Sequence, residues 1–311
     1  MFNSLKPSCS YCGSLEAFCF MFKIFKIFIL FFSLTIGSCV LAETAVPERI
    51  VSLAPSYDEI LIELGFQDRI VGVTTSSDYL EEVERAERIG LWSKPNIEKI
   101  VALKPDLVLA TCFAGQQTAA EKLSALGLRV VTLDETQGIE EIFAKTRQVG
   151  DILGIPARTK TLLERMRATV TTTKRLAATV SSRPRVYMET GSNPLFTCGK
   201  GSFIHEMIEI AGGKNIAGDI AQPFPRISSE FVINSDPEVI ILPYMGRNFG
   251  KEALKQRKGW EKIAAIRTGR VYDDIGSQVI TIPSPRLVLY GLPALLERIH
   301  PEIMPEKTKN E

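Results

Sequence analysis

Residues 49–74, RIVSLAPSYDEILIELGFQDRIVGVT, decide the fold class. Two short β-branched runs, RIVSLA and RIVGVT, flank the helical pattern SYDEILIELGF, so this stretch predicts a strand, a helix and a second strand. Ser56 and Glu59 have the spacing of a capping box, and Gly65 stands where the helix should stop. A strand–helix–strand order of this kind predicts a parallel βα unit.

The same alternation of strand and helix patterns extends through both halves of the chain. Between the halves, residues 139–183 carry a long helical pattern that is interrupted at Gly154 and Pro156. We therefore predict an α/β fold of two Rossmann-like lobes joined by a long rigid helix, with a ligand cleft between the lobes. The expected parts are an N-terminal lobe over residues 43–138, a helical connector over 139–183, a C-terminal lobe over 184–303 and a polar tail over 304–311.

Composition excludes several classes of function. The 311 residues are 45% hydrophobic and 23% charged, which is typical of a globular protein. The net charge of +1 offers no basic surface, so we expect no nucleic-acid partner. His205 and His300 are the only histidines, and they lie far apart, so we expect no metal site. The sequence has no Gly-x-Ser-x-Gly elbow and no Walker loop, which favours a protein that is not an enzyme.

The N-terminus has the pattern of a secretory signal peptide. Residues 24–40 are almost wholly apolar, with Lys23 and Lys26 near their start, so we assign residues 1–42 to a signal peptide, with Met21 as an alternative start. Two alternatives remain open for the processing of this segment: cleavage before Glu43, or lipidation of Cys39. The exported chain keeps two cysteines in different halves, and free thiols are the expected state for them.

A repeat relates the two halves at an offset of 132 residues. Residues 96–109 match residues 228–241: each copy has a helix N-cap residue, a Glu two positions later, a Pro and a buried strand run. The two acidic residues are Glu98 and Glu230. One interpretation is that they are two good helix starts, since an acid there favours the helix dipole. The other is that each lobe presents one carboxylate to a symmetric partner.

Several aromatic residues follow strand ends among Gly and Pro, which favours a ligand-stacking cleft, although a packing role is equally open for each. They are Tyr79, Trp92, Phe113, Phe196, Phe224 and Tyr244.

From residue 49 to about residue 299, the chain resembles the class III periplasmic substrate-binding proteins of ABC importers, the iron-siderophore/cobalamin group, and is most similar to the cobalamin-binding branch. The segments that carry the resemblance are RIVSLAPSYDEILIELGF, VGVTTSSDY, W(S)KPNIEKIVALKPDLVLA, GSNPLFTCGKGSFIHEMIEIAGGKNIAGD, PFPRISSEFV and PSPRLVL.

This resemblance implies that a corrinoid binds between the lobes. The ligand-binding residues that it implies are Tyr79, Trp92, Thr111, Phe196, Phe224 and Gln278. Thr111 and Phe224 stand where the cobalamin-binding branch has tryptophans. Gln278 and Ile282 stand where it has an Asp and an Arg that face the corrin amides. These departures leave the exact ligand open, with a ferric siderophore or haem as the alternatives.

The resemblance also implies partners and a location. Glu98 and Glu230 match the glutamates that dock on arginines of the permease subunits in the inner membrane. The protein is then a monomer without a cofactor, and it is periplasmic or anchored through a lipid on Cys39. The candidate siderophore contacts are Arg226, Arg247 and Arg286. A remote alternative is an exported α/β enzyme that uses Asp78 or Glu189 as an acid or base.

Overall fold

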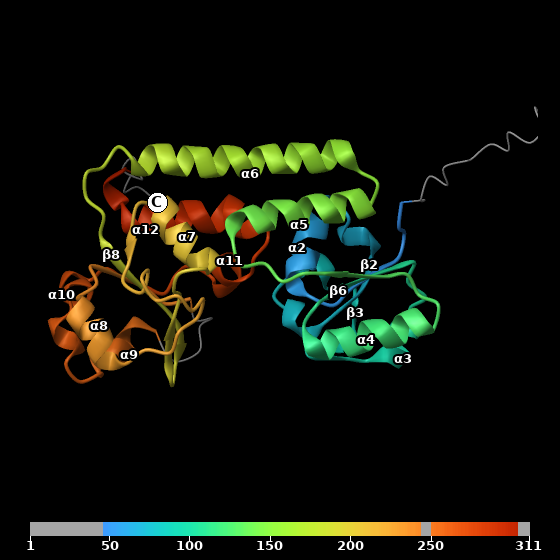
Figure 1. Cartoon of the computed structure of the whole chain (residues 1–311), viewed down its shortest axis with the longest axis horizontal. Coiled ribbons are helices and arrows are strands. Elements are labelled where there is room, and N and C mark those ends of the chain that lie inside the picture. Colours follow the sequence, from blue (N-terminus) through green and yellow to red (C-terminus); the bar gives the residue numbers. More distant parts are fainter. Residues whose placement is uncertain (1–45, 244–249, 304–311) are drawn as a thin grey trace, which may run out of the picture. The chain divides into compact units, whose positions relative to one another are not determined.

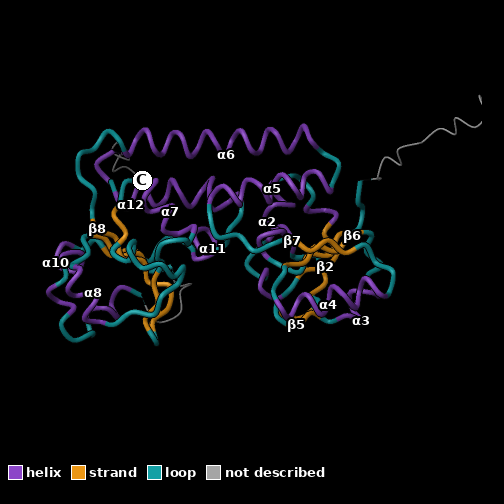
Figure 2. Tube along the Cα trace, in the orientation of Figure 1, coloured by secondary structure: helices purple, strands orange, loops and turns teal. Residues whose placement is uncertain are grey.

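The computed structural model describes residues 46–243 and 250–303. The predicted signal peptide with Cys39, the predicted polar tail, Tyr244 and Arg247 lie outside the described residues. Among the helices within the described ranges, none combines the length and the apolarity that a bilayer crossing requires. Two parallel sheets with flanking helices make up this part of the chain (Figures 1 and 2).

The N-terminal lobe is built on a five-stranded sheet in the order β3-β2-β1-β6-β7. All of its neighbouring strands are parallel, which confirms the predicted βα units. The strands are β1 (Ile50–Ser52), β2 (Ile70–Val73), β3 (Glu87–Arg88), β6 (Leu107–Thr111) and β7 (Val130–Leu133), and a separate hairpin joins β4 (Gly90–Leu91) to β5 (Lys94–Pro95). The helices are α2 (Pro55–Glu63), α3 (Ile97–Ala102) and α4 (Ala114–Ala125), with short 3-10 turns η1 (Gln67–Arg69), η2 (Thr75–Ser77) and η3 (Glu81–Val83).

The C-terminal lobe repeats this plan around strands in the order β10-β8-β11-β12, which are parallel, while β9 pairs antiparallel with β8. The strands are β8 (Arg185–Ser192), β9 (Leu195–Thr197), β10 (Lys214–Asn215), β11 (Val239–Ile241) and β12 (Val271–Tyr272). The helices are α7 (Phe203–Ile210), α8 (Ser229–Ser235), α9 (Lys251–Lys255), α10 (Ala264–Thr268), α11 (Ser277–Thr281) and α12 (Leu292–Ile299). Shorter turns are the 3-10 segments η4 (Trp260–Lys262) and η6 (Pro301–Ile303) and the π-helical segment η5 (Leu287–Gly291).

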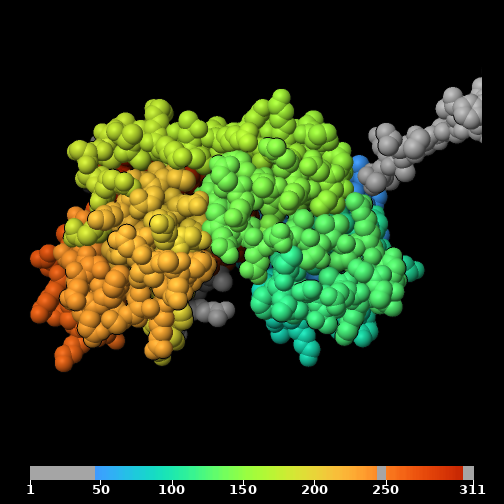
Figure 3. Space-filling view, in the orientation of Figure 1, coloured from blue at the N-terminus to red at the C-terminus, as the bar shows by residue number. Residues whose placement is uncertain are grey.

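Two helices, α5 (Ile139–Ile152) and α6 (Pro156–Ala177), connect the lobes. They pack against each other, and α6 also contacts α7 and α12 of the C-terminal lobe. Figure 3 shows the side chains of α5 and α6 as one continuous surface. Gly150 permits this close packing, because a Cβ atom there would lie 1.9 Å from Thr159 Oγ1. The helices separate at Gly154, whose positive φ of 70° suits a residue without a side chain.

In both lobes, successive side chains along a strand point alternately into two different hydrophobic cores. In β6, Leu107 belongs to a core cluster that also includes residues of α5, α6 and α12, whereas Val108 faces a cluster within the N-terminal lobe. In β8, Val186 joins the same shared cluster, whereas Tyr187 faces a cluster within the C-terminal lobe. Because strand side chains alternate between faces, each sheet turns one face to the shared core and the other to its own lobe. The lobes are therefore joined by a continuous apolar core.

The predicted capping box at the start of α2 is wrong. The helix begins at Pro55 after Ala54, and no side chain caps it. A Pro in the first turn is already preorganised for a helix, and Glu59 points into the protein, where it is 1% exposed. The predicted end is confirmed, since Gly65 follows the C-cap residue with a φ of 77°.

Candidate functional site

A cavity of about 240 Å³ lies beyond the carboxyl ends of β1 and β6. We call it the cleft cavity. This is the place where α/β sheets bind ligands, because the chain leaves neighbouring strands in opposite directions there. Its lining residues come from both halves of the chain: Ala54, Pro55, Ser56, Trp92, Thr111, Glu135, Thr136, Lys145, Thr281, Ile282 and Pro283.

Trp92 provides an aromatic wall of the cleft cavity. It lies in the turn between β4 and β5 and is half-buried. Its ring stacks on Phe113, with the ring centres 4.2 Å apart and the planes tilted by 35°. Phe113 lies two residues after the end of β6 and is 36% exposed. The hairpin and the end of β6 thus present a pair of aromatic rings beside the cavity.

Gln116, which the sequence analysis missed, fixes this wall. Its side chain is fully buried in the first turn of α4. The amide nitrogen donates to the carbonyl oxygens of Leu53, at 2.6 Å, and Trp92, at 3.0 Å. The amide oxygen accepts from the backbone N–H of Thr111 at 2.9 Å and from its hydroxyl at 3.1 Å. One side chain therefore joins the ends of two strands to the hairpin that carries Trp92.

The two charged residues that line the cleft cavity, Lys145 and Glu135, have opposite charges. Lys145 of α5 is 7% exposed, and its ammonium group donates to the carbonyl oxygen of Asp134. It also lies 5.7 Å from the centre of the Tyr57 ring. Burial lowers the pKa of Lys145. Glu135 contributes the opposite charge and is exposed. No sequence motif marked Lys145 or Glu135 as a residue of the binding site.

Four of the predicted ligand residues do not line the cleft cavity. The Tyr79 hydroxyl donates to Glu59 Oε1 at 2.7 Å, and Phe196 is half-buried in β9. Phe224 is 47% exposed and meets Phe203 edge-to-face, with the ring centres 6.3 Å apart. Gln278 lies in α11, whose last residue Thr281 does line the cavity. Of the six predicted ligand residues, the structure therefore brings Trp92 and Thr111 together in the lining of the cleft cavity and leaves the other four outside that lining.

The predicted docking glutamates occupy equivalent places on two short helices. Glu98 is the second residue of α3, where the Asn96 side chain accepts from the Lys99 N–H at 2.9 Å. Glu230 is the second residue of α8, where the Ser228 hydroxyl accepts from the Phe231 N–H at 3.2 Å. Both carboxylates are exposed.

The repeat continues in the backbone after each of these helices. Lys104 and Asp236, which stand at the same offset, have positive φ angles of 48° and 43°. Among the described residues other than glycine, only these two adopt the left-handed conformation. Each then leads through a proline to a buried strand, β6 or β11. Because a positive φ is sterically costly for these residues, its presence in both turns indicates that the two units share the same backbone conformation.

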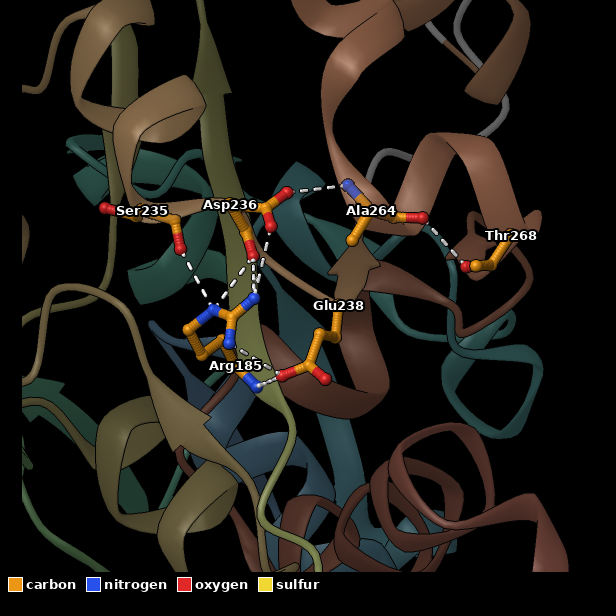
Figure 4. A network of polar contacts seen from close by, with 6 residues as sticks. All are labelled: Arg185, Ser235, Asp236, Glu238, Ala264 and Thr268. Carbon is orange, nitrogen blue, oxygen red and sulfur yellow. Dashed lines mark hydrogen bonds and ion pairs between the residues drawn. The ribbon is translucent and has the colours of Figure 1, made fainter.

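An arginine holds each turn from the neighbouring strand. Arg49 donates from Nε and Nη2 to the Leu103 carbonyl oxygen at 3.0 and 2.7 Å, and its own N–H donates to Asp106. Arg185 donates from Nε to the carbonyl oxygens of Ser235 and Asp236 at 3.1 and 2.9 Å. Figure 4 shows the Arg185 guanidinium enclosed by this turn and by Glu238, which accepts from the Arg185 N–H.

The residues suggested for alternative chemistries lie elsewhere. Glu189 is fully buried and forms a two-point ion pair with Arg257, at 2.6 and 2.7 Å, while Asp78 pairs with Arg88 at 2.7 Å. Neither histidine lines the cleft cavity: His205 contacts Asn215, and His300 contacts the Gly212 carbonyl oxygen and Glu302. Within residues 46–243 and 250–303, no three His, Cys, Asp or Glu side chains are grouped to hold a metal ion. Cys112 is exposed, Cys198 is buried, and both are free.

Comparison with known proteins identifies the family. Residues 50–276 match the family described as periplasmic binding protein. The chain belongs to this family. The uncharacterized ABC transporter substrate-binding lipoprotein YvrC of Bacillus subtilis is 31% identical over 265 residues, which cover 84% of this chain and 82% of that protein.

Two further comparisons bear on the ligand. The vitamin B12-binding protein of Salmonella choleraesuis is 31% identical over 247 residues, covering 78% of this chain and 86% of that protein. The solved structure of the periplasmic heme-binding protein RhuT from Roseiflexus sp. RS-1 in apo form superposes with a TM-score of 0.73 at 26% identity, covering 83% of this chain and 99% of that one. This periplasmic binding protein is thus the substrate-binding component of an ABC importer, in a family of transport proteins that deliver a ligand to a membrane permease. The predicted family and fold class are confirmed.

Proposed function

We propose that this periplasmic binding protein captures cobalamin or a related corrinoid and delivers it to a membrane permease. The observation that carries the proposal is the similarity to a vitamin B12-binding protein along most of both chains. A corrinoid is a flat macrocycle with neutral amide side chains. An aromatic wall at Trp92 suits the flat ring, because such a contact buries a large apolar area at a small cost in side-chain entropy.

The charges of the cleft cavity also favour a ligand with neutral amides. Glu135 offers carboxylate oxygens that accept from amide N–H groups, and Lys145 balances its charge. Thr111 adds a polar group at the end of β6. A cavity with this balance has no excess of cations with which to hold an anionic ligand. The neutral amides of a corrinoid match such a lining, because they can pair with its polar groups without bringing in an excess of charge at that point.

Haem is the second candidate, because the similarity to RhuT favours it. Haem iron is held in proteins by axial ligands such as His, Tyr, Cys or Met. Both histidines of this chain are engaged away from the cleft cavity, and the Tyr79 hydroxyl is bonded to Glu59. The carboxylate of Glu135 would also face the anionic propionates of haem. These contacts support a corrinoid over haem.

A ferric siderophore has less support. Of the arginines considered for such an anionic complex, Arg286 is already paired with Glu63 and Glu82, and Arg226 is exposed and absent from the cavity lining. A charged ligand would need cations that remain available to it.

Delivery would use the two matched helix starts. We propose that Glu98 and Glu230 form ion pairs with arginines on two permease subunits and that the protein works as a monomer. It would act in the periplasm, either free or held at the membrane through a lipid on Cys39. The equal placement of the carboxylates on α3 and α8 supports this docking.

Calorimetric titration with cobalamin, cobinamide, haem and a ferric hydroxamate tests the proposed ligand. We expect cobalamin to bind, cobinamide to bind if the corrin ring supplies most of the contact, and haem and the hydroxamate to give no saturable heat. Saturable binding of haem without binding of either corrinoid would contradict the proposal and favour the second candidate.

A further inference from the structure

Glu59 is a buried carboxyl group between two walls of the cleft cavity. It lies one turn along α2 from Pro55 and Ser56, which line the cavity. Its Oε1 accepts from the Tyr79 hydroxyl at 2.7 Å, and its Oε2 accepts from the Ser284 hydroxyl. The side chain thus joins two segments that are far apart in the sequence.

Ser284 connects this carboxyl group to the opposite wall. It directly follows Thr281, Ile282 and Pro283, which line the cleft cavity from the C-terminal half of the chain. Ser284 is fully buried, and its hydroxyl also accepts from the Arg286 N–H at 3.1 Å. The bond between Glu59 and Ser284 therefore ties this wall to α2, next to the ion pair between Arg286 and Glu63 of the same helix.

We propose that Glu59 is a positioning residue of the binding site, whose carboxylate holds the C-terminal wall of the cleft cavity, through Ser284, against the helix that carries the N-terminal wall. The inference rests on the proposed function, since it takes the cleft cavity as the place where the ligand binds. Glu59 itself does not line the cavity. Its effect on the ligand is transmitted through the spacing of the two walls.

The surroundings of Glu59 make this bridge sensitive to pH. Burial raises the pKa of Glu59 to about 7, against the lowering effect of its bonds to Ser284 and Tyr79 and of the Arg286 charge. Burial likewise raises the pKa of Asp58 to about 7. The titratable and charged groups that face this region are Asp58 and Glu63 from α2, Tyr79, Glu82 and Arg88 from the segments after β2, Arg165 from α6, and Arg286 and Tyr290 from the C-terminal segment.

Ionised Glu59 makes the stronger bridge. A carboxylate accepts from both hydroxyls at once, and hydrogen bonds to a charged acceptor are stronger than neutral ones. A protonated carboxyl group carries its own donor, so one of the two hydroxyls must then reorient. We therefore expect affinity for the ligand to rise as the pH increases through about 7.

Folding stability should change in the opposite direction. The folded-state pKa of Glu59 lies above its ordinary value, so the folded protein binds this proton more tightly than the unfolded chain does. The contribution to stability is complete below the unfolded-state pKa and is lost as the pH rises toward about 7. A purely structural role would make affinity follow stability, whereas the bridge makes affinity rise while stability falls.

The test measures the dissociation constant of cobalamin between about pH 5.5 and about pH 8.5 for three proteins. For the wild type we expect binding to be roughly five-fold weaker at the acid end. Glu59→Gln keeps the shape and has one acceptor and one donor, like the protonated acid, so its affinity should match the acid limb of the wild type at every pH. The matched control is Asp58→Asn, because Asp58 is equally buried but is bonded to Ser77 within the N-terminal lobe.

A measurement without ligand separates this inference from the proposed function. The backbone amide of Arg286 donates to Ser284, so its chemical shift in nuclear magnetic resonance should titrate near pH 7 in the wild type and in Asp58→Asn, and stay constant in Glu59→Gln. Failure of the wild type to bind any corrinoid would overturn the proposed function, and the amide titration would still decide the bridge. A wild-type affinity for cobalamin that is independent of pH, or a titration of the Arg286 amide that persists in Glu59→Gln, would overturn the inference.

Discussion

In the N-terminal lobe, Arg49 binds the turn that follows α3, and in the C-terminal lobe, Arg185 binds the turn that follows α8. The helix starts, the left-handed turns and the following strands correspond residue by residue. The lining of the cleft cavity has no such correspondence. Among the described residues after 184, the lining includes only the short segment from Thr281 to Pro283, while Trp92 and most of the remaining lining come from the N-terminal lobe.

This difference is what we expect if the protein has to meet a symmetric partner and also bind a ligand without symmetry. A partner built from two equal subunits requires equal surfaces, and the repeated helix–turn–strand unit supplies one in each lobe. A ligand without symmetry requires unequal walls, and the cleft cavity has an aromatic hairpin at Trp92 on one side and the segment around Pro283 on the other. The proposed docking surfaces and the proposed ligand site should therefore respond independently to mutation.

The largest expected effect is on delivery. Reversing both docking charges, Glu98→Arg with Glu230→Arg, should abolish stimulation of transport by a permease in reconstituted vesicles, because each carboxylate would be replaced by a charge that repels its arginine partner. The single reversals should be intermediate and similar to each other if the two units are equivalent. Corrinoid affinity, measured as a control, should stay at the wild-type value. Transport at the wild-type rate by the double variant would mean that the repeat consists of two helix caps without a docking role.

The second prediction concerns an ion pair that is buried in the C-terminal lobe. Arg257→Met removes the two-point ion pair of the fully buried Glu189 carboxylate, so unfolding should require about 3–5 kcal/mol less free energy in urea titration. The matched control is Lys255→Met in the same lobe, because the Lys255 side chain is 60% exposed and its ion pair with Glu252 is screened by solvent.

A double variant sharpens this prediction about the C-terminal lobe. Glu189→Leu combined with Arg257→Met removes both charges, so it should recover part of the stability that Arg257→Met loses. Equal destabilisation by Arg257→Met and Lys255→Met would mean that burial of Glu189 does not distinguish the two sites.

The third prediction compares aromatic residues of the two lobes. Trp92→Ala should weaken cobalamin binding by about 1–3 kcal/mol, because the indole ring lines the cleft cavity and would lose its contact with the ligand. Phe196→Ala should have a smaller effect, since Phe196 does not line that cavity. The measurement is calorimetric titration of each variant. An unchanged dissociation constant for both variants would remove the proposed ligand site.

Sequence patterns among neighbouring residues predicted the strands and helices of the fold. Features that depend on contacts between distant segments could not be predicted in this way. Strand runs such as the one ending at Thr111, and the stop at Gly65, depend on neighbouring residues and could be predicted from the sequence. The bond between Glu59 and Ser284 joins residues 225 positions apart, and no local pattern records it. Glu59 had instead the spacing of a capping box with Ser56, and burial of its side chain overrode that local signal.

The candidate site likewise contains residues that could be predicted from local sequence and residues that could not. Trp92 could be predicted, because an aromatic residue among Gly, Ser and Pro after a strand is typical of a ligand loop. Gln116 and Lys145 could not, because each acts through contacts that only the folded chain creates: Gln116 with Leu53, and Lys145 with Tyr57. The sequence analysis therefore identified residues that a loop displays and missed those that hold the walls in place.

The smallest expected effect tests the equivalence of the two repeated units. Asn96→Ala and Ser228→Ala each remove a side chain that accepts from the backbone of the first helical turn, so each should lower the free energy of unfolding by about 1 kcal/mol in urea titration. Because the bonds are equivalent in α3 and α8, the two losses should be similar, and the double variant should show their sum, since the sites share no contact. Thr118→Ala in α4 is the control: its exposed hydroxyl donates only a long bond of 3.5 Å to Ala114, and its loss should change stability little. A loss at Ser228 several times that at Asn96 would show that the two units, although alike in backbone, differ in how strongly each lobe depends on α3 or α8.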